Sequence, residues 1–219
     1  MRIIAIVNQK GGVGKTSLAM NLASFLCTTG RHTLVLDADP QRSATRWAAA
    51  RNGSGGIEVH FLDADRSIEI VSQDLERIAT ETGAEFAVLD CPPQLRSATE
   101  VALLLADVTL IPVGASPLDI WAAEEVLEFA RDAQEVRGDG KLQVALVPNR
   151  LGGTVMSREL PSVLEALGER LAPAISERIV VAESAILGQT LPEYAPNSRA
   201  SGEFLALTHF VMEILDGQS

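Results

Sequence analysis

A glycine-rich loop between a short apolar strand and an amphipathic helix constrains the fold of this chain more than any other feature. Residues 8–17 read NQKGGVGKTS and directly follow the apolar stretch at residues 3–7. Glycines let backbone N–H groups converge on phosphate oxygens, and a helix N-terminus adds partial positive charge. The order strand, loop, helix therefore predicts a phosphate-binding loop. In such a loop Lys15 would neutralise the β- and γ-phosphates, and the Thr16 hydroxyl would ligate Mg²⁺.

The rest of the chain alternates between short apolar runs and longer segments of helical periodicity. We interpret the runs as continuous strands buried on both faces of a sheet, at residues 3–7, 33–36, 57–61, 86–89, 108–113 and 142–147. This pattern predicts an α/β fold with three layers, in which helices cover both faces of a mostly parallel, twisted sheet. We expect a single domain over residues 1–219, the whole chain.

Apolar residues repeat at helical spacing in three places. Two such stripes consist of Leu18, Leu22, Phe25 and Leu26, and of Ile120, Ala123, Leu127 and Ala130. A last helix is predicted with Ser201 as its N-cap, followed by Phe204, Leu207, Val211, Ile214 and Leu215.

Composition and charge argue against some classes of protein. Eighteen basic against 29 acidic residues give a net charge of −11, which argues against a uniformly basic, constitutive nucleic-acid binder. Neither a signal peptide nor an apolar run of membrane-spanning length is evident, so we expect a cytosolic protein. Cys27 and Cys91 lie in apolar stretches and are expected to be free thiols. Residues 52–56, NGSGG, form the only flexible-looking stretch, too short for a domain linker.

Carboxylates follow two of the predicted strands. Asp37 and Asp39 end the second strand in the sequence DADPQ, and Asp90 ends the apolar run at residues 86–89. Ligands of open α/β sheets bind at the carboxyl ends of the strands, so these side chains are expected beside the phosphate loop. Asp90 there would hold Mg²⁺ through water, since Mg²⁺ keeps much of its hydration shell.

The phosphate loop departs from the ordinary pattern, because Gln9 stands where that pattern has its first glycine. A second lysine, Lys10, follows it. The loop resembles the deviant Walker A motif of the ParA/MinD superfamily of P-loop ATPases. The resemblance implies that ATP and Mg²⁺ bind at Lys10, Gly11, Gly12, Val13, Gly14, Lys15, Thr16 and Ser17. It also implies a homodimer formed on ATP, in which Lys10 reaches the phosphates of the partner's nucleotide and joins Lys15 in catalysis.

The same resemblance gives roles to the carboxylates. Asp39 would position or activate the attacking water, Asp37 would lie near Mg²⁺ and its water shell, and Asp90 would end a Walker B strand. Residues 91–94 would form a second switch, with Pro92 and Pro93 where many relatives have a glycine.

Three further segments carry the resemblance. Residues 111–119 resemble the proline-containing assembly segment of short, ParF-like ParA proteins. Asn149 and Arg150 resemble the family's adenine-contacting position, and residues 183–200 resemble its C-terminal segment that closes over the base. In the last segment Gly188, Gln189, Tyr194 and Ser198 to Ala200 carry the likeness. Because the first strand starts at residue 3, we expect no N-terminal helix-turn-helix and no specific operator binding.

The function that this resemblance implies is cargo positioning. An ATP-bound sandwich dimer would bind DNA without sequence preference and associate with the nucleoid, and a ParB-like or other adaptor would stimulate hydrolysis. The cargo stays open. Candidate DNA contacts are Arg150, Arg158, Arg170, Arg178 and Arg199.

Three alternatives use the same fold. A membrane-bound, MinD-like ATPase needs a basic amphipathic C-terminal helix, whereas residues 204–219 contain no Lys or Arg, so we expect no membrane partner. An electron carrier like the nitrogenase iron protein needs two suitably placed cysteines, and only Cys91 lies near the right region. A metabolic ATP-dependent ligase or kinase would turn over ATP in response to a small molecule.

Overall fold

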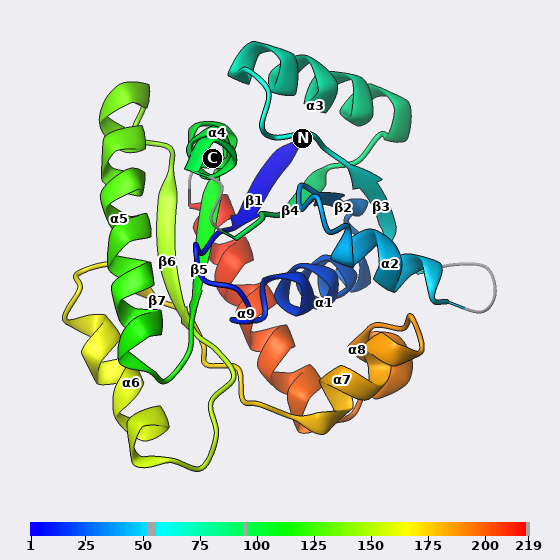
Figure 1. The fold of residues 1–219 in the computed structure, drawn as a ribbon. Coiled ribbons are helices and arrows are strands. Elements are labelled where there is room, and N and C mark those ends of the chain that lie inside the picture. Colours follow the sequence, from blue (N-terminus) through cyan, green and yellow to red (C-terminus); the bar gives the residue numbers. More distant parts are fainter. Residues whose placement is uncertain (52–55, 94–95, 218–219) are drawn as a thin grey trace.

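The chain forms a seven-stranded parallel sheet covered by helices on both faces (Figure 1). The computed structural model describes residues 1–51, 56–93 and 96–217, so most of the predicted flexible stretch at residues 52–56 lies outside the described residues. The strand order is β3-β2-β4-β1-β5-β6-β7. The strands span Arg2–Ile6 (β1), Thr33–Asp37 (β2), Glu58–Phe61 (β3), Phe86–Asp90 (β4), Val108–Val113 (β5), Gln143–Pro148 (β6) and Arg170–Leu171 (β7). The predicted fold class is confirmed.

Nine helices lie in the part of the chain that the structure describes. They span Lys15–Thr28 (α1), Ser43–Ala49 (α2), Ile68–Thr82 (α3), Arg96–Leu105 (α4), Pro117–Arg137 (α5), Val155–Glu165 (α6), Ile179–Ile186 (α7), Leu191–Tyr194 (α8) and Arg199–Asp216 (α9).

Two apolar cores, one on each face of the sheet, produce the three layers. Successive residues of a strand point to opposite faces, so Ile3 and Ala5 of β1 pack beneath α3, α4, α5 and α6, while Ile4 and Ile6 pack against α1, α2 and α9. All residues of β2, β4 and β5 are buried. Burial on both faces explains why these strands are continuously apolar in sequence.

Two strand predictions need correction. β3 lies at one edge of the sheet and pairs only with β2, so its ends, Glu58 and Phe61, are exposed rather than buried on both faces. β7 at the opposite edge was not predicted, because two residues carry no periodicity. The other strands lie within one residue of their predicted bounds.

The predicted N-cap of the last helix is wrong by three residues. α9 begins at Arg199, and the Ser198 side chain accepts a hydrogen bond from the backbone N–H of Ser201. Ser201 is therefore inside the first turn, where its hydroxyl donates to the carbonyl of Ala195 at 2.6 Å. Ser198 is the N-cap because its backbone is extended and it directly precedes the first turn of α9.

The two cysteines differ in environment. Both are free, as predicted, but Cys27 is exposed at the end of α1, whereas Cys91 is buried behind β4. Burial raises the pKa of the Cys91 thiol, with the Asp90 carboxylate as a further cause. Separately, none of the helices in the described residues has the length and apolar character needed to cross a bilayer.

The parallel register brings the carboxyl ends of three strands together. Asp37 of β2 and Ile6 of β1 are both register partners of Asp90 on β4. The loop after β1 therefore lies beside both carboxylates, and the topology alone assembles the predicted site.

Candidate functional site

The loop after β1 has the backbone of a phosphate-binding loop. Gly12 and Gly14 have φ angles of +80° and +90°, which favour glycine, and Gly14 is the N-cap of α1. Lys15 is buried, and its ammonium donates to the carbonyls of Asn8 and Lys10, both at 2.9 Å. Burial lowers the pKa of Lys15, and Asp90 opposes that shift. Two carbonyls of the loop thus hold the Lys15 ammonium in place.

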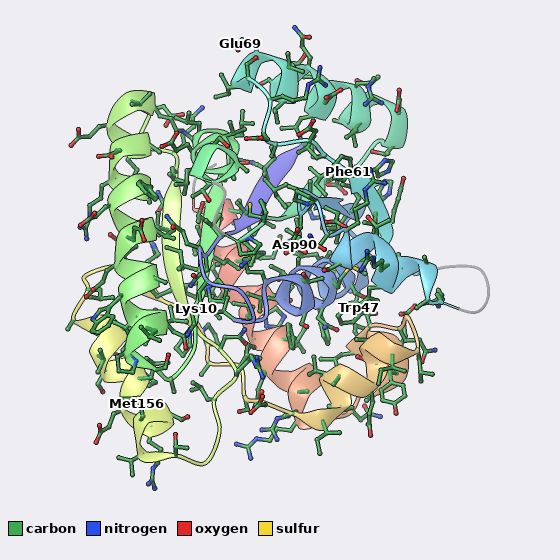
Figure 2. All side chains as sticks on the ribbon, in the orientation of Figure 1. Lys10, Trp47, Phe61, Glu69, Asp90 and Met156 are labelled. Carbon is green, nitrogen blue, oxygen red and sulfur yellow. The ribbon has the colours of Figure 1, made fainter. Side chains whose placement is uncertain are left out.

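Asp90 is the strongest indication of a bound cation. Its side chain is buried at the centre of the molecule (Figure 2), and neither carboxylate oxygen makes a hydrogen bond to any residue that the structure describes. Burial raises the pKa of Asp90 to about 7, Asp37 adds to the shift, and the nearby Thr16 hydroxyl and Lys15 ammonium oppose it.

A buried carboxylate without partners is costly unless a cation or water compensates it. The described residues hold no cluster of three or more His, Cys, Asp or Glu side chains able to bind a metal. One carboxylate, one hydroxyl and solvent nevertheless fit Mg²⁺, which is held by few protein oxygens and keeps several waters.

Asp37 has a structural task that the sequence did not indicate. Its Oδ2 accepts from the backbone N–H and the hydroxyl of Thr45 at 2.8 and 2.7 Å, and its Oδ1 accepts from the N–H of Asp39 at 3.2 Å. The buried carboxylate thereby fixes the start of α2 and the turn that carries Asp39. It stays close enough to Asp90 to raise that residue's pKa.

A cavity of about 570 Å³ opens beside the loop, within the usual size range of ligand sites. Its lining includes Asp39 and the loop residues Gly11, Gly12 and Gly14 to Ser17. It also includes apolar side chains from Ile175, Val181, Ala185, Ile186 and Phe204. A lining that combines a phosphate-binding loop with apolar side chains fits a nucleotide with its phosphates on the loop.

Lys10 lies on the other side of the loop. Its ammonium is 2.6 Å from Asp119 Oδ1 and 3.4 Å from the Ser116 hydroxyl, both at the start of α5 (Figure 2). It lines a second cavity, of about 370 Å³, together with Gly114 and Thr154. The two lysines of the loop therefore face different spaces.

Asn149 and Arg150 lie at the end of β6 and contact the loop. The Asn149 side-chain amide donates to the carbonyl of Val13 at 2.7 Å, and the Arg150 guanidinium donates to the carbonyl of Gly12 at 2.6 Å. Both residues line the larger cavity, so the structure brings them to the predicted site.

Residues 183–200, the segment expected to close over the base, lie only partly at the cavity. Ala185 and Ile186 of α7 line the cavity. Gln189 instead accepts a hydrogen bond from Trp47 of α2 at 3.1 Å, and the Tyr194 hydroxyl lies 3.4 Å from Glu183. Trp47 points toward the α7 and α8 side of the molecule in Figure 2.

The candidate DNA contacts differ in exposure. The Arg199 side chain is 82% exposed, although it lies 3.8 Å from Glu203. Arg178 is bound by Glu203 at 2.8 Å and Arg150 by Glu177 at 2.5 Å, so these two already have anionic partners. Arg158 and Arg170 are exposed on α6 and β7.

Sequence reasoning missed four residues of the site: Asn8, Thr45, Asp119 and Glu177. Asn8 is buried, accepts from the Lys10 N–H at 2.8 Å and donates to the Pro112 carbonyl at 2.9 Å. The sequence carried no signal for this contact between the loop and β5.

Comparison with known proteins agrees with this geometry. The sequence model of the family described as "CobQ/CobB/MinD/ParA nucleotide binding domain" matches residues 4–191. The maintenance of carboxysome distribution protein A of Halothiobacillus neapolitanus is 30% identical over 203 residues, covering 91% of each chain. The chromosome-partitioning ATPase Soj of Thermus thermophilus is 30% identical over 241 residues, covering 97% of this chain and 96% of Soj.

Among solved structures, apo McdA of Cyanothece has the same fold. The TM-score is 0.78 at 19% identity, over 98% of this chain and 99% of that chain.

Proposed function

Because the chain belongs to the CobQ/CobB/MinD/ParA nucleotide-binding family of P-loop ATPases, we propose that it forms a sandwich dimer on ATP and positions a cargo. The dimer binds DNA without sequence preference and hydrolyses ATP when a ParB-like or other adaptor stimulates it. The named relatives support positioning as the task, since one is a chromosome-partitioning ATPase and one maintains carboxysome distribution.

The placement of Lys10 carries the dimer part of the proposal. Lys10 is not among the residues that line the larger cavity, and its ammonium lies beside Asp119 and Ser116 at the second cavity. In the dimer, Lys10 exchanges Asp119 for the phosphates of the nucleotide in the second subunit, which carry more negative charge.

The chain's own residues have these roles in hydrolysis. Lys15 and the loop amides hold the phosphates, and Asp39 at the edge of the cavity orients the attacking water. Thr16 and Asp90 hold Mg²⁺, with Asp37 fixing the turn beside them. Bound Mg²⁺ supplies charge neutralisation for the transferring phosphoryl group. The partner's Lys10 would complete the site, so turnover would be slow until dimerisation.

The test uses the Asp39→Ala variant, which should bind ATP but not hydrolyse it. With Mg-ATP we expect a dimer by light scattering and retention on random-sequence DNA. With ADP we expect a monomer and no retention. Equal behaviour with both nucleotides contradicts the proposal, and so does normal hydrolysis by Asp39→Ala.

Two rival functions would give other outcomes. Co-sedimentation with anionic liposomes only in ATP would indicate a MinD-like membrane ATPase. Turnover stimulated by a metabolite, but not by DNA with an adaptor, would indicate a ligase or kinase on the same fold.

A further inference from the structure

Two consecutive residues at the end of β6 hold two consecutive carbonyls of the phosphate loop. Asn149 Nδ2 donates to the carbonyl of Val13 at 2.7 Å, and Arg150 Nη1 donates to the carbonyl of Gly12 at 2.6 Å. These contacts join residues 136 and 138 positions apart in the chain. They link the loop to the end of β6.

A carbonyl held in place also fixes the N–H of the same peptide unit. The peptide is planar and trans, so the C=O and the following N–H point in opposite directions. With the carbonyls of Gly12 and Val13 turned toward β6, the N–H groups of Val13 and Gly14 are turned away from it. We propose that Asn149 and Arg150 are positioning residues for phosphate binding, which fix the orientation of these loop amides.

The backbone and the surroundings of Asn149 hold its side chain in place. The Asn149 N–H donates to the carbonyl of Val113 at 2.8 Å, which ties it to the end of β5. Asn149 itself is only 4% exposed. A Cβ at Gly14 would lie 2.7 Å from Asn149 Nδ2, so this close approach requires glycine there.

Arg150 is held in an unfavourable backbone conformation. Its φ of +56° is one of two positive values among the described non-glycine residues, and L side chains rarely adopt such a conformation. Strain of this kind persists only where the surroundings impose it. Here the Leu151 N–H donates to the Ile175 carbonyl at 3.1 Å and holds the turn.

An ion pair extends the support to the segment that follows Ile175, a residue of the cavity's apolar lining. Arg150 Nη2 lies 2.5 Å from Glu177 Oε1, and the Glu177 N–H donates to the Leu151 carbonyl at 2.9 Å. Arg150 thus joins the loop to the segment beside the apolar lining of the cavity.

This inference rests on the proposed binding of ATP, and it differs from the base contact expected for Asn149. A ligand without a base separates the two roles. Inorganic triphosphate with Mg²⁺ can use the loop amides but has no adenine to contact. Its affinity is measured by competition against a fluorescent ATP analogue, beside that of unlabelled ATP.

We expect Asn149→Ala and Arg150→Ala each to weaken both ligands by about ten-fold, the effect of one hydrogen bond to a charged or buried group. Arg150→Lys should recover only part of the loss, because an ammonium lacks the planar fork that reaches two partners. Arg131→Ala is the control: this exposed side chain of α5 lies 3.9 Å from Glu169, away from both cavities. It should leave both affinities unchanged.

Several outcomes would overturn the inference. Loss of ATP affinity with unchanged triphosphate affinity would assign Asn149 to the base, and unchanged affinity for both would remove the positioning role. Arg150 is 52% exposed, so Arg150→Ala keeps the test valid if Asn149→Ala fails to fold. A wild-type protein that binds neither ligand would instead contradict the proposed function itself.

Discussion

At the scale of single residues, the site is built around the Asp90 carboxylate, whose charge the nearby Thr16 hydroxyl and Lys15 ammonium compensate only in part. Asp90 is buried without a hydrogen-bond partner among the described residues, and burial raises its pKa to about 7. Proteins keep such a group where a ligand needs it, because it weakens the fold. A cation that offsets the Asp90 charge would therefore raise the free energy of unfolding when nucleotide binds with it.

Asp90→Asn should make the nucleotide-free protein more stable, and increasingly so with rising pH. The folded pKa lies about three units above the ordinary value of 3.8. Between these two values the folded state binds the extra proton, so wild-type stability falls as pH rises from about 4 to 7. The penalty relieved by asparagine is thus at most about 4 kcal/mol at pH 8.

Thermal denaturation of both proteins from pH 5 to 8, without nucleotide or Mg²⁺, measures this difference. Asp90→Asn should also lose the stabilisation that Mg²⁺ adds to bound ATP. A difference between the proteins that does not change with pH would contradict the role given to Asp90.

Site residues that directly follow a strand could be predicted from the sequence, and site residues on loops from distant parts of the chain could not. The loop from Lys10 to Ser17 and the carboxylates after β2 and β4 were predictable, because each follows a strand whose end must lie at one edge of the sheet. Asp119 beside Lys10, and Glu177 beside Arg150, were not. Those contacts depend on how loops fold back across the sheet, which no local pattern records.

At the scale of elements, α2 connects the nucleotide site to the turn after α7. Asp37 fixes the start of α2, Trp47 donates to Gln189, and Arg51 lies 2.6 Å from Glu193 at the end of the helix. Gly188 fits against the backbone of Arg51 at the same place. The strands were predictable from continuous apolar runs. This packing between helices was not, because an apolar stripe shows which face of a helix is buried but not which element packs against it.

Gly188→Ala should destabilise the protein by about 3 kcal/mol, which is typical of overpacking against backbone. A Cβ there would lie 2.2 Å from the Arg51 nitrogen, and the φ of +66° disfavours alanine as well. Gly202→Ala is the matched control, since among the described residues nothing beyond its own turn of α9 lies within 4 Å of the added Cβ. That change should stabilise by about 1 kcal/mol through helix propensity. Urea denaturation compares the two, and equal effects would contradict the packing described.

At the scale of the whole molecule, the net charge of −11 requires that any DNA binding come from one local face. Dimerisation on ATP would double such a face and align its two halves. This gives a physical reason why DNA binding should depend on the nucleotide, since a single acidic monomer offers few cations.

Arg199→Ala should weaken DNA binding by the ATP-bound dimer and lower the salt slope of log affinity by about 1 per subunit contact. Arg199 is the most exposed of the three candidate arginines that lie within 4 Å of a carboxylate, with 82% of its side chain exposed. Arg77→Ala is the control, because Arg77 is exposed on α3 and pairs with Asp74 and Glu81. Fluorescence anisotropy across a salt series measures both. Identical slopes for the two variants would remove Arg199 from the DNA contacts.

If two chains share each ATPase site, mixing two inactive variants should restore activity. Lys10→Ala and Asp39→Ala should each bind ATP but hydrolyse it poorly when alone. In a mixed dimer, the Lys10→Ala subunit keeps its own Asp39 and receives Lys10 from its partner, which completes one site. We expect an equal mixture to regain roughly a quarter of wild-type turnover, since half the dimers are mixed and each has one complete site. A mixture no more active than its two components would show that the two chains do not share a site.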